Sequence, residues 1–161
     1  MKCLERARYR LDSSVLPGRR MRRWVFGAVY DFRGAPNSPY HASIADVRGH
    51  GASPILEIPV SENPLMRGTP IGGGFLNTYG PEKTVDAVRK VEGSAVVLVF
   101  HPWEFVDLAS KFPGLPKWML AGCRSDLSPL SEFLASLKTD EWEFLTLGQV
   151  AKSYQRTQAG S

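Results

Sequence analysis

The chain has 161 residues, of which 43% are hydrophobic, and a formal net charge of +4 at pH 7. This length and composition suit one globular domain with its own core and exclude a disordered chain. The longest uninterrupted apolar run, residues 95–100, is far shorter than the roughly 20 residues of a membrane-spanning helix. The first fifteen residues are charged rather than apolar and resemble no signal peptide. The chain as written has the pattern of a cytoplasmic protein without a membrane partner, and the sequence leaves the compartment of a longer parent protein open.

Two residue types bear on the kind of site to expect. The two cysteines, Cys3 and Cys123, are too few for a disulfide framework or a structural metal site. Arginines are concentrated near the start of the chain, as Arg19, Arg20, Arg22, Arg23 and Arg33. This group can form a patch for phosphate or an acidic polysaccharide, or it can be a solvated loop. We favour the solvated loop.

The first third of the chain predicts little regular structure. Residues 2–8 have the pattern of a helix end, and residues 9–15 that of a short strand. Residues 16–53 are rich in Pro, Gly and Arg, with two prolines within the segment 34–41, so we expect an ordered but irregular excursion there. Residues 54–61 alternate between apolar and polar side chains and predict a strand.

The middle of the chain predicts a helix followed by a buried strand. Pro81 suits a first helical position, valines follow at helical spacing, and Gly93 ends the predicted helix over 81–91. Residues 95–100 form a continuous run of small, β-branched and apolar side chains, which is typical of a strand that is covered on both faces. The strand ends at His101, because the proline after it cannot continue a sheet ladder.

The last third predicts further helices and one more strand. Pro113, Gly114 and Pro116 within 104–123 allow only short helical pieces there. A helix is expected over 129–138, with Ser128 as its cap, and a strand over 142–147. Strands that alternate with helices predict an α/β fold, with parallel strands and outer helices.

Five short segments occur in a fixed order over most of residues 8–150. They are YRLDSSV at 9–15, ILEIPVS at 55–61, GGGF at 72–75, FHPWEF at 100–105 and EFLTLGQV at 143–150. In this order they resemble the strands and loops of the NodB-type polysaccharide deacetylases, which are carbohydrate esterase family 4-like enzymes. These hydrolases remove N-acetyl groups from amino-sugar polymers by breaking the C–N amide bond with the help of a divalent metal.

The resemblance covers only the C-terminal portion of such a domain. The family's Asp pair and its H-x-x-x-[S/T]-x-H motif, which hold the metal, are absent from this sequence. The resemblance therefore implies the C-terminal half of an irregular (β/α)7 barrel over residues 1–153, and we expect a flexible tail over 154–161. His41, His50 and His101 lack metal-ligand spacing, so we expect no metal site and no cofactor in this chain, and zinc only in the complete domain.

The resemblance also implies which residues form the site. His101 would be the catalytic general acid, which suits an imidazole because it exchanges protons near neutral pH. Gly73, Gly74, Phe75 and Trp103 would bind the substrate, and we expect His101 to face a concavity that is lined by residues 72–75. The three glycines match no nucleotide-binding pattern and would let the backbone pass close to a substrate or another loop. Glu104 can hydrogen-bond to His101 or cap the following segment, and we favour the cap.

Three functions remain open at this point. In the first, the chain is part of a polysaccharide deacetylase, inactive when isolated, with a polysaccharide or amino-sugar substrate. In the second, it is a non-catalytic remnant or partner subunit that binds glycan or a separate N-terminal half. The third and weaker alternative is a small basic nucleic-acid-binding module. The first two predict association with an N-terminal half or self-association, and no nucleic-acid partner.

Overall fold

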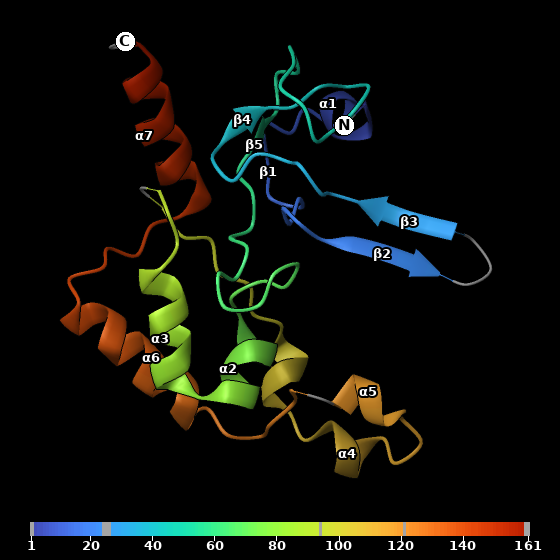
Figure 1. Ribbon diagram of the computed structural model, residues 1–161, viewed down its shortest axis with the longest axis vertical. Helices are drawn as coiled ribbons and strands as arrows, with labels where there is room; N and C mark the ends of the chain where they lie inside the picture. The colour runs from blue at the N-terminus through green and yellow to red at the C-terminus, as the bar shows by residue number, and fades with distance from the viewer. Residues whose placement is uncertain (1, 24–26, 94, 121, 160–161) are drawn as a thin grey trace.

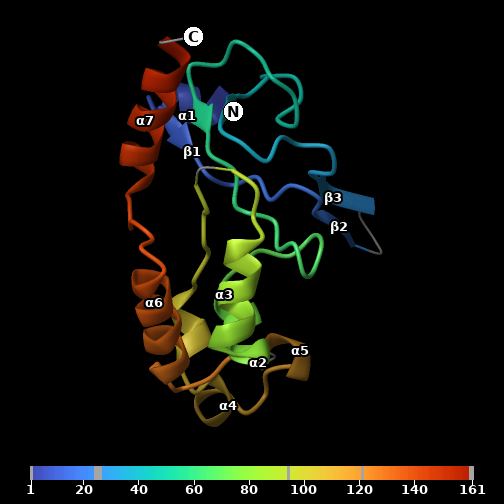
Figure 2. The same cartoon turned by 60° about the vertical axis from the view of Figure 1, so that its left-hand side comes forward.

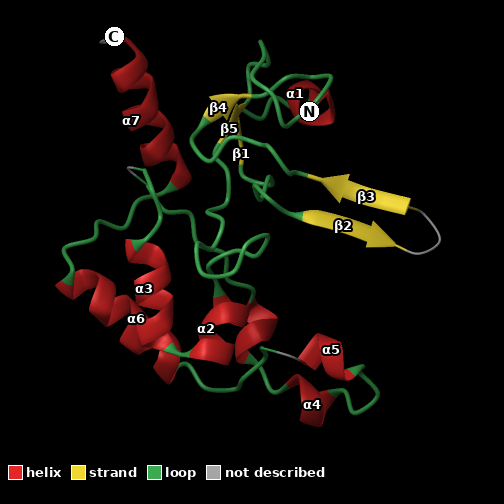
Figure 3. Cartoon of the chain, viewed as in Figure 1, coloured by secondary structure: helices red, strands yellow, loops and turns green. Residues whose placement is uncertain are grey.

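The computed structural model describes residues 2–23, 27–93, 95–120 and 122–159. It has a mixed α/β architecture with two small sheets, which do not close into a barrel in the described part of the chain (Figures 1 and 3). The elements in chain order are α1 (Lys2–Arg6), β1 (Leu11–Asp12), β2 (Arg20–Arg23), β3 (Gly27–Asp31), β4 (Tyr40–His41), β5 (Leu56–Glu57), α2 (Gly73–Tyr79), α3 (Pro81–Arg89), η1 (Pro102–Phe105), α4 (Leu108–Lys111), α5 (Lys117–Leu120), α6 (Ser128–Thr139) and α7 (Leu147–Ala159). None of the described helices has the length and apolarity to cross a bilayer.

The three-stranded sheet has the order β1-β5-β4 and lies with α1 and α7 at one end of the molecule (Figures 1 and 2). β1 and β5 are parallel, and β4 is antiparallel to β5. Both predicted strands, over 9–15 and 54–61, exist but are shortened to two ladder residues each. Leu56 and Ile58 pack against Ala151 of α7, and Glu57 between them therefore points to the opposite face of the sheet.

The second sheet is the β2–β3 hairpin, which projects away from the rest of the described chain (Figures 1 and 2). Its antiparallel ladder contains an irregularity between Met21 and Arg22. The prediction of a wholly irregular segment over 16–53 is therefore wrong, because the segment contains this hairpin and β4. The strands are paired in an antiparallel ladder, and neither the arginine-rich β2 (RMRR) nor β3 (GAVYD) has the clear apolar alternation that signals a strand.

The helices α2, α3 and α6 enclose the larger core at the other end of the molecule (Figure 2). Its fully buried side chains include Ile71, Leu76, Val88 and Phe133. The predicted helices over 81–91 and 129–138 are confirmed as α3 and α6. α6 begins at Ser128, whose backbone N–H donates to the Asp126 carboxylate, so the capping acceptor lies two residues earlier than predicted.

The prediction of a regular, fully buried strand over 95–100 is wrong. The segment is extended, but only Val99 forms a bridge, with Gly72, and every side chain from 95 to 100 is half-buried. The N–H of Val99 donates to Ile71, while the carbonyl of Val97 accepts from Ser61, so both residues bond along the same edge. On the other edge, no backbone hydrogen bond joins Val96, Leu98 or Phe100 to any described residue. Val96, Leu98 and Phe100 pack partly against the larger core and Val97 against the smaller cluster, so both faces are covered only in part, and one edge has no described strand beside it.

The predicted strand over 142–147 and the predicted tail from 154 also differ from the structure. Residues 142–146 have no regular structure, and α7 runs from Leu147 to Ala159, past the start of the expected tail. The side chains of Val150, Ala151 and Tyr154 pack on the cluster formed with Leu56 and Ile58. Burial against the sheet orders this segment as a helix, and the local sequence alone does not reveal that contact.

Candidate functional site

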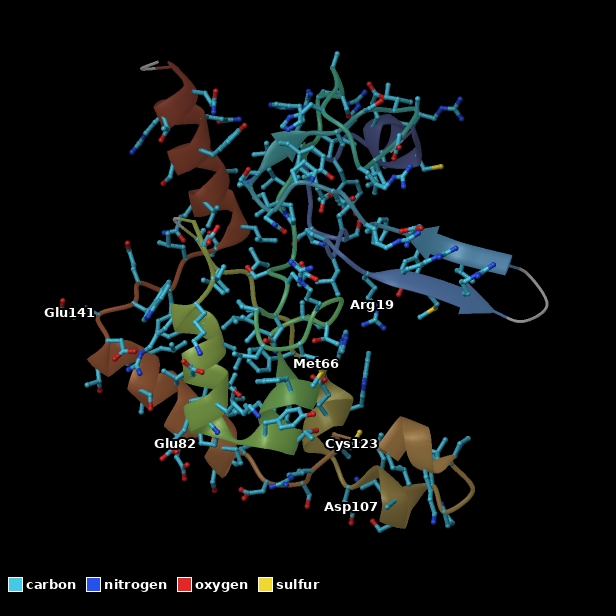
Figure 4. All side chains as sticks on the ribbon, viewed as in Figure 1. Arg19, Met66, Glu82, Asp107, Cys123 and Glu141 are labelled. Atoms are coloured by element: carbon cyan, nitrogen blue, oxygen red, sulfur yellow. The ribbon has the colours of Figure 1, made fainter. Side chains whose placement is uncertain are left out.

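A cavity of about 570 Å³ lies where the end of the 95–100 segment meets the start of α2. His101 lines it together with Gly72, Gly73, Gly74 and Phe75. The expected concavity shared by the histidine and the glycine segment is therefore present. Its other walls include Arg19 and Met66, which Figure 4 labels between the hairpin and α2.

His101 is an exposed residue at the start of η1. Its imidazole stacks on the indole of Trp103, with ring centroids 4.1 Å apart and ring planes inclined by 10°. Trp103 is 52% exposed and is not among the described residues that line the cavity. The resemblance implies that Trp103 binds the substrate, but Trp103 does not line the cavity. Its indole contacts the His101 ring instead. A flat stack of this kind restricts the orientation of the imidazole.

Glu104 joins η1 to the start of α2. One carboxylate oxygen accepts from the backbone N–H of Gly74 at 2.8 Å, and the other accepts from the backbone N–H of His101 at 2.6 Å. Glu104 is therefore a capping carboxylate, but it caps the start of α2, which precedes it in the chain, and not the following segment that the preferred interpretation named. The alternative, a hydrogen bond to His101, is also present and is made to the backbone N–H of that residue. A carboxylate is stabilised at this place because the first N–H groups of a helix have no partner within it.

The glycine segment contacts protein backbone and side chain at close range. A Cβ atom on Gly72 would overlap the carbonyl oxygen of Val99, and one on Gly73 would overlap the Glu104 carboxylate. Gly73 and Gly74 form the first turn of α2 rather than a free loop, which corrects the expectation for residues 72–75. The sequence leaves two reasons for the glycines open, a close approach to a substrate or to another protein segment. The structure has the close approach to a protein segment, and Gly74 and Phe75 also line the cavity.

Asn77 is a residue of this site that the sequence did not single out. Its buried side-chain amide donates to the carbonyls of Glu104 and Gly122, at 2.8 Å each. It thereby fixes η1 and the segment before α6 against α2. Asn77 sits in the predicted loop-to-helix region with no motif around it, so only the fold reveals this role.

Arg19 and Glu104 are the oppositely charged side chains among the described residues that line the cavity. The Nε–H of Arg19 donates to the Tyr30 hydroxyl at 3.1 Å, and its Nη1 lies 3.4 Å from the carbonyl oxygen of Gly68. Tyr79, which also lines the cavity, is 42% exposed, and the ammonium of Lys83 lies 4.8 Å from the centre of its ring. Arg19 belongs to the arginine group noted in the sequence, but the sequence does not show which arginine of that group lines the cavity.

The described residues do not fit a catalytic zinc. No group of three or more His, Cys, Asp or Glu side chains in the described part of the chain is placed to hold a metal ion, whereas catalytic zinc needs three protein ligands. His41 and His50 are exposed and lie outside the cavity: His41 Nδ1 pairs with the carbonyl of Ser53, and His50 packs on the Tyr40 ring. No chemical step can therefore be assigned to a metal held by these residues.

Sequence comparison places the chain in a family. Residues 24–151 match the family described as "Domain of unknown function (DUF3473)". No curated protein and no solved structure has significant similarity to the chain. The matched residues include the 95–100 segment, α2 and η1, which form most of the cavity. Because the match covers most of its length, the chain belongs to the DUF3473 family.

Proposed function

We propose that this chain supplies the general-acid side of a polysaccharide deacetylase site, with His101 as the catalytic acid. The observation that carries the proposal is the cavity in which His101 and the Gly72–Phe75 segment meet. This is the arrangement that the resemblance to the NodB-type deacetylases implies. The exposed imidazole is accessible to a ligand, and Trp103 and Glu104 hold the residue from two sides.

The reaction that this residue serves is hydrolysis of an N-acetyl group. Water adds to the acetyl carbon, the C–N bond breaks, and the products are acetate and a free amino sugar. The nitrogen that leaves must gain a proton, because an amide anion is a very poor leaving group. The His101 imidazolium donates that proton and regains one from solvent, a role typically worth about 10²–10⁴-fold in rate. The groups that activate the water lie outside the described residues.

Two unpaired strand edges support the half-barrel part of the proposal. β1 pairs with β5 on one side only, and the 95–100 segment bonds along one edge only. Unpaired N–H and C=O groups of this kind favour the addition of further strands. We infer that these two edges receive the complementary strands of the barrel, or those of a second copy of the chain.

The test begins with the DNA upstream of the codons for this chain. It is read for an open frame that encodes the Asp pair and the H-x-x-x-[S/T]-x-H motif. Acetate release from chitin oligosaccharides is then measured on the protein that carries both parts. We expect His101→Gln to reduce kcat at least about 100-fold, and His50→Ala to leave it unchanged. Undiminished activity in His101→Gln would overturn the proposal.

A non-catalytic glycan-binding subunit is the second candidate. It is favoured by the lack of a three-ligand metal set in the described residues and by the exposed rings of Tyr79 and Trp103 beside the cavity. Exposed aromatic faces stack well on sugar rings. Glycan binding without acetate release, in the presence of the complementary part, would establish this alternative over the enzyme.

A further inference from the structure

Arg19 lines the cavity, whereas its neighbours Arg20, Arg22 and Arg33 do not. Arg20 and Arg33 both lie within ion-pair distance of the Asp31 carboxylate, at 3.5 Å and 2.6 Å. No carboxylate of a described residue lies within that distance of Arg19, although Arg19 lines the cavity. Its charge is therefore left for whatever the cavity binds.

The guanidinium of Arg19 is held by two hydrogen bonds and keeps other N–H donors free. Nε donates to Tyr30 Oη, and one proton of Nη1 points to the carbonyl of Gly68. The Nη2 group makes no hydrogen bond to any described residue. The free donors are thus the second N–H of Nη1 and both N–H groups of Nη2. An arginine that is held in this way and keeps donors on both terminal nitrogens is pre-organised to bind two oxygens of a carboxylate or sulfate.

Glu104 lines the same cavity but does not pair with Arg19. Both of its oxygens accept backbone N–H groups, from Gly74 and His101, and no ion pair joins it to Arg19. Its negative charge remains, so an anion in the cavity would be bound by the free N–H donors of Arg19 and not by an excess of positive charge in the lining. Lys83 lies outside the lining, over the ring of Tyr79.

We propose that the polysaccharide bound by this cavity is acidic, and that Arg19 is the residue that selects it. The inference rests on the proposed function for the glycan class and adds the charge of the polymer. The sugar ring packs against the aromatic wall formed by Phe75 and Tyr79, while the outer nitrogens of Arg19 bind an anionic substituent. A carboxylate and a sulfate ester have the same recognition chemistry at this point, and the experiment separates them.

The experiment measures binding of three hexasaccharides to the purified chain by calorimetry. Hyaluronan carries N-acetylglucosamine with a uronate, chitin carries N-acetylglucosamine without charge, and chondroitin sulfate carries both a uronate and a sulfate ester. We expect both acidic oligosaccharides to bind at least about tenfold more tightly than the chitin oligosaccharide, and added salt to reduce that preference. Unsulfated chondroitin is measured as a fourth oligosaccharide, because it has the same sugars as chondroitin sulfate. Tighter binding of chondroitin sulfate than of unsulfated chondroitin identifies the sulfate ester as the preferred anion, and equal binding identifies the carboxylate.

Variants assign the preference to Arg19. Arg19→Gln should abolish the preference for acidic oligosaccharides and leave binding of the chitin oligosaccharide unchanged. Arg19→Lys should restore part of it, because the charge remains without the planar fork. Arg48→Gln is the matched control: it removes the same charge from an exposed ion pair with Asp46, so the preference should persist.

The possible contrary results have different meanings. Equal binding of acidic and neutral oligosaccharides by the wild-type chain overturns the inference and leaves the deacetylase proposal intact. Equal loss of both in Arg19→Gln also overturns it, because Arg19 then only maintains the shape of the cavity. Preference for a single-stranded oligonucleotide over every oligosaccharide overturns it in favour of a nucleic-acid-binding module. Failure to bind any oligosaccharide overturns the inference and also counts against the glycan class of the proposed function.

Discussion

Glu57 and Asp12 lie opposite each other in the parallel β1–β5 pair and present two carboxyl groups on one face of the sheet. Glu57 is fully buried; one of its oxygens accepts from the backbone N–H groups of Ser14 and Val15, and Oε2 has no described hydrogen-bond partner. Tyr40 of β4 faces Glu57 from the other side. Burial above all, together with the negative charge of Asp12, raises the pKa of Glu57 to about 7.

The first prediction concerns stability against pH. Because the pKa of Glu57 is raised in the folded state, the folded chain binds its proton more tightly than the unfolded chain. The contribution of Glu57 to the free energy of unfolding should therefore be greatest below pH 4.5, fall as the pH rises to about 7, and stay level above that. Carboxylates with lowered pKa values, such as Asp46 and Asp140, lose their own contributions at acid pH, so the decline between pH 4.5 and 7 is the part assigned to Glu57. The loss amounts to roughly 3 kcal/mol, at about 1.4 kcal/mol for each pKa unit. Denaturant unfolding at a series of pH values measures it.

Glu57→Gln should remove this dependence, because an amide does not titrate, and should make the chain more stable than wild type at pH 8. Asp46→Asn is the control. Hydrogen bonds from Arg48 lower the pKa of Asp46 to about 2, so this substitution should change the profile only at acid pH. An unchanged slope in Glu57→Gln between pH 4.5 and 7 would contradict the assignment.

The second prediction tests the close approach of α2 to the 95–100 segment. Gly72→Ala should lower the free energy of unfolding by roughly 2–4 kcal/mol, because the new Cβ would overlap the carbonyl oxygen of Val99 and the backbone must move. Gly114→Ala is the control, since nothing lies near its Cβ position. Thermal and denaturant unfolding measure both variants, and equal stabilities would show that the contact is looser than described.

The third prediction tests the double cap made by Glu104. Glu104→Ala removes the acceptor of two N–H groups and should destabilise the chain by roughly 2 kcal/mol, and Glu104→Gln by less, because one good acceptor remains. Hydrogen exchange should become faster at the amides of Gly74 and His101 in particular. Glu132→Ala, on the exposed side of α6, should change neither quantity. Unaltered exchange at Gly74 would show that Glu104 does not hold α2.

The fourth prediction concerns metal. The purified chain should contain no stoichiometric zinc by elemental analysis, and EDTA should leave its unfolding midpoint unchanged, because the described residues provide no three-ligand set. The isolated chain should also release no acetate from chitin oligosaccharides. Stoichiometric zinc that is lost in His101→Ala would show that the histidine is a ligand and not the proton donor.

The fifth prediction concerns association. The 95–100 segment leaves one backbone edge without partners among the described residues, and its apolar side chains are only half-buried. Each such side chain that stays exposed forfeits up to about 1.5–3 kcal/mol, against a typical total stability of about 5–15 kcal/mol. Light scattering after size exclusion should therefore give a mass above 17.8 kDa. A monomer that unfolds cooperatively would contradict the half-barrel interpretation.

Local chemistry in the sequence determined the helices α3 and α6 and the position of His101. Pro81 begins α3 because its fixed φ and missing N–H suit a first helical position. Leu130, Phe133, Leu134 and Leu137 lie on one face of α6, which packs into the larger core. Pro102 ends the extended segment directly after His101, and the capping role of Glu104 follows from a carboxylate near free N–H groups.

Only the tertiary structure decided the rest of the site and the arrangement of the sheets. Whether an extended segment joins a ladder depends on which strands lie beside it, so 95–100 and 142–146 do not form the strands that their composition predicts. α7 is ordered by its contact with Leu56 and Ile58, which are far away in sequence. The same holds for charge. Arg19 lines the cavity and the pKa of Glu57 is raised because of the residues that folding places around them. Those neighbours are distant in the sequence, so the residue types alone do not predict either property.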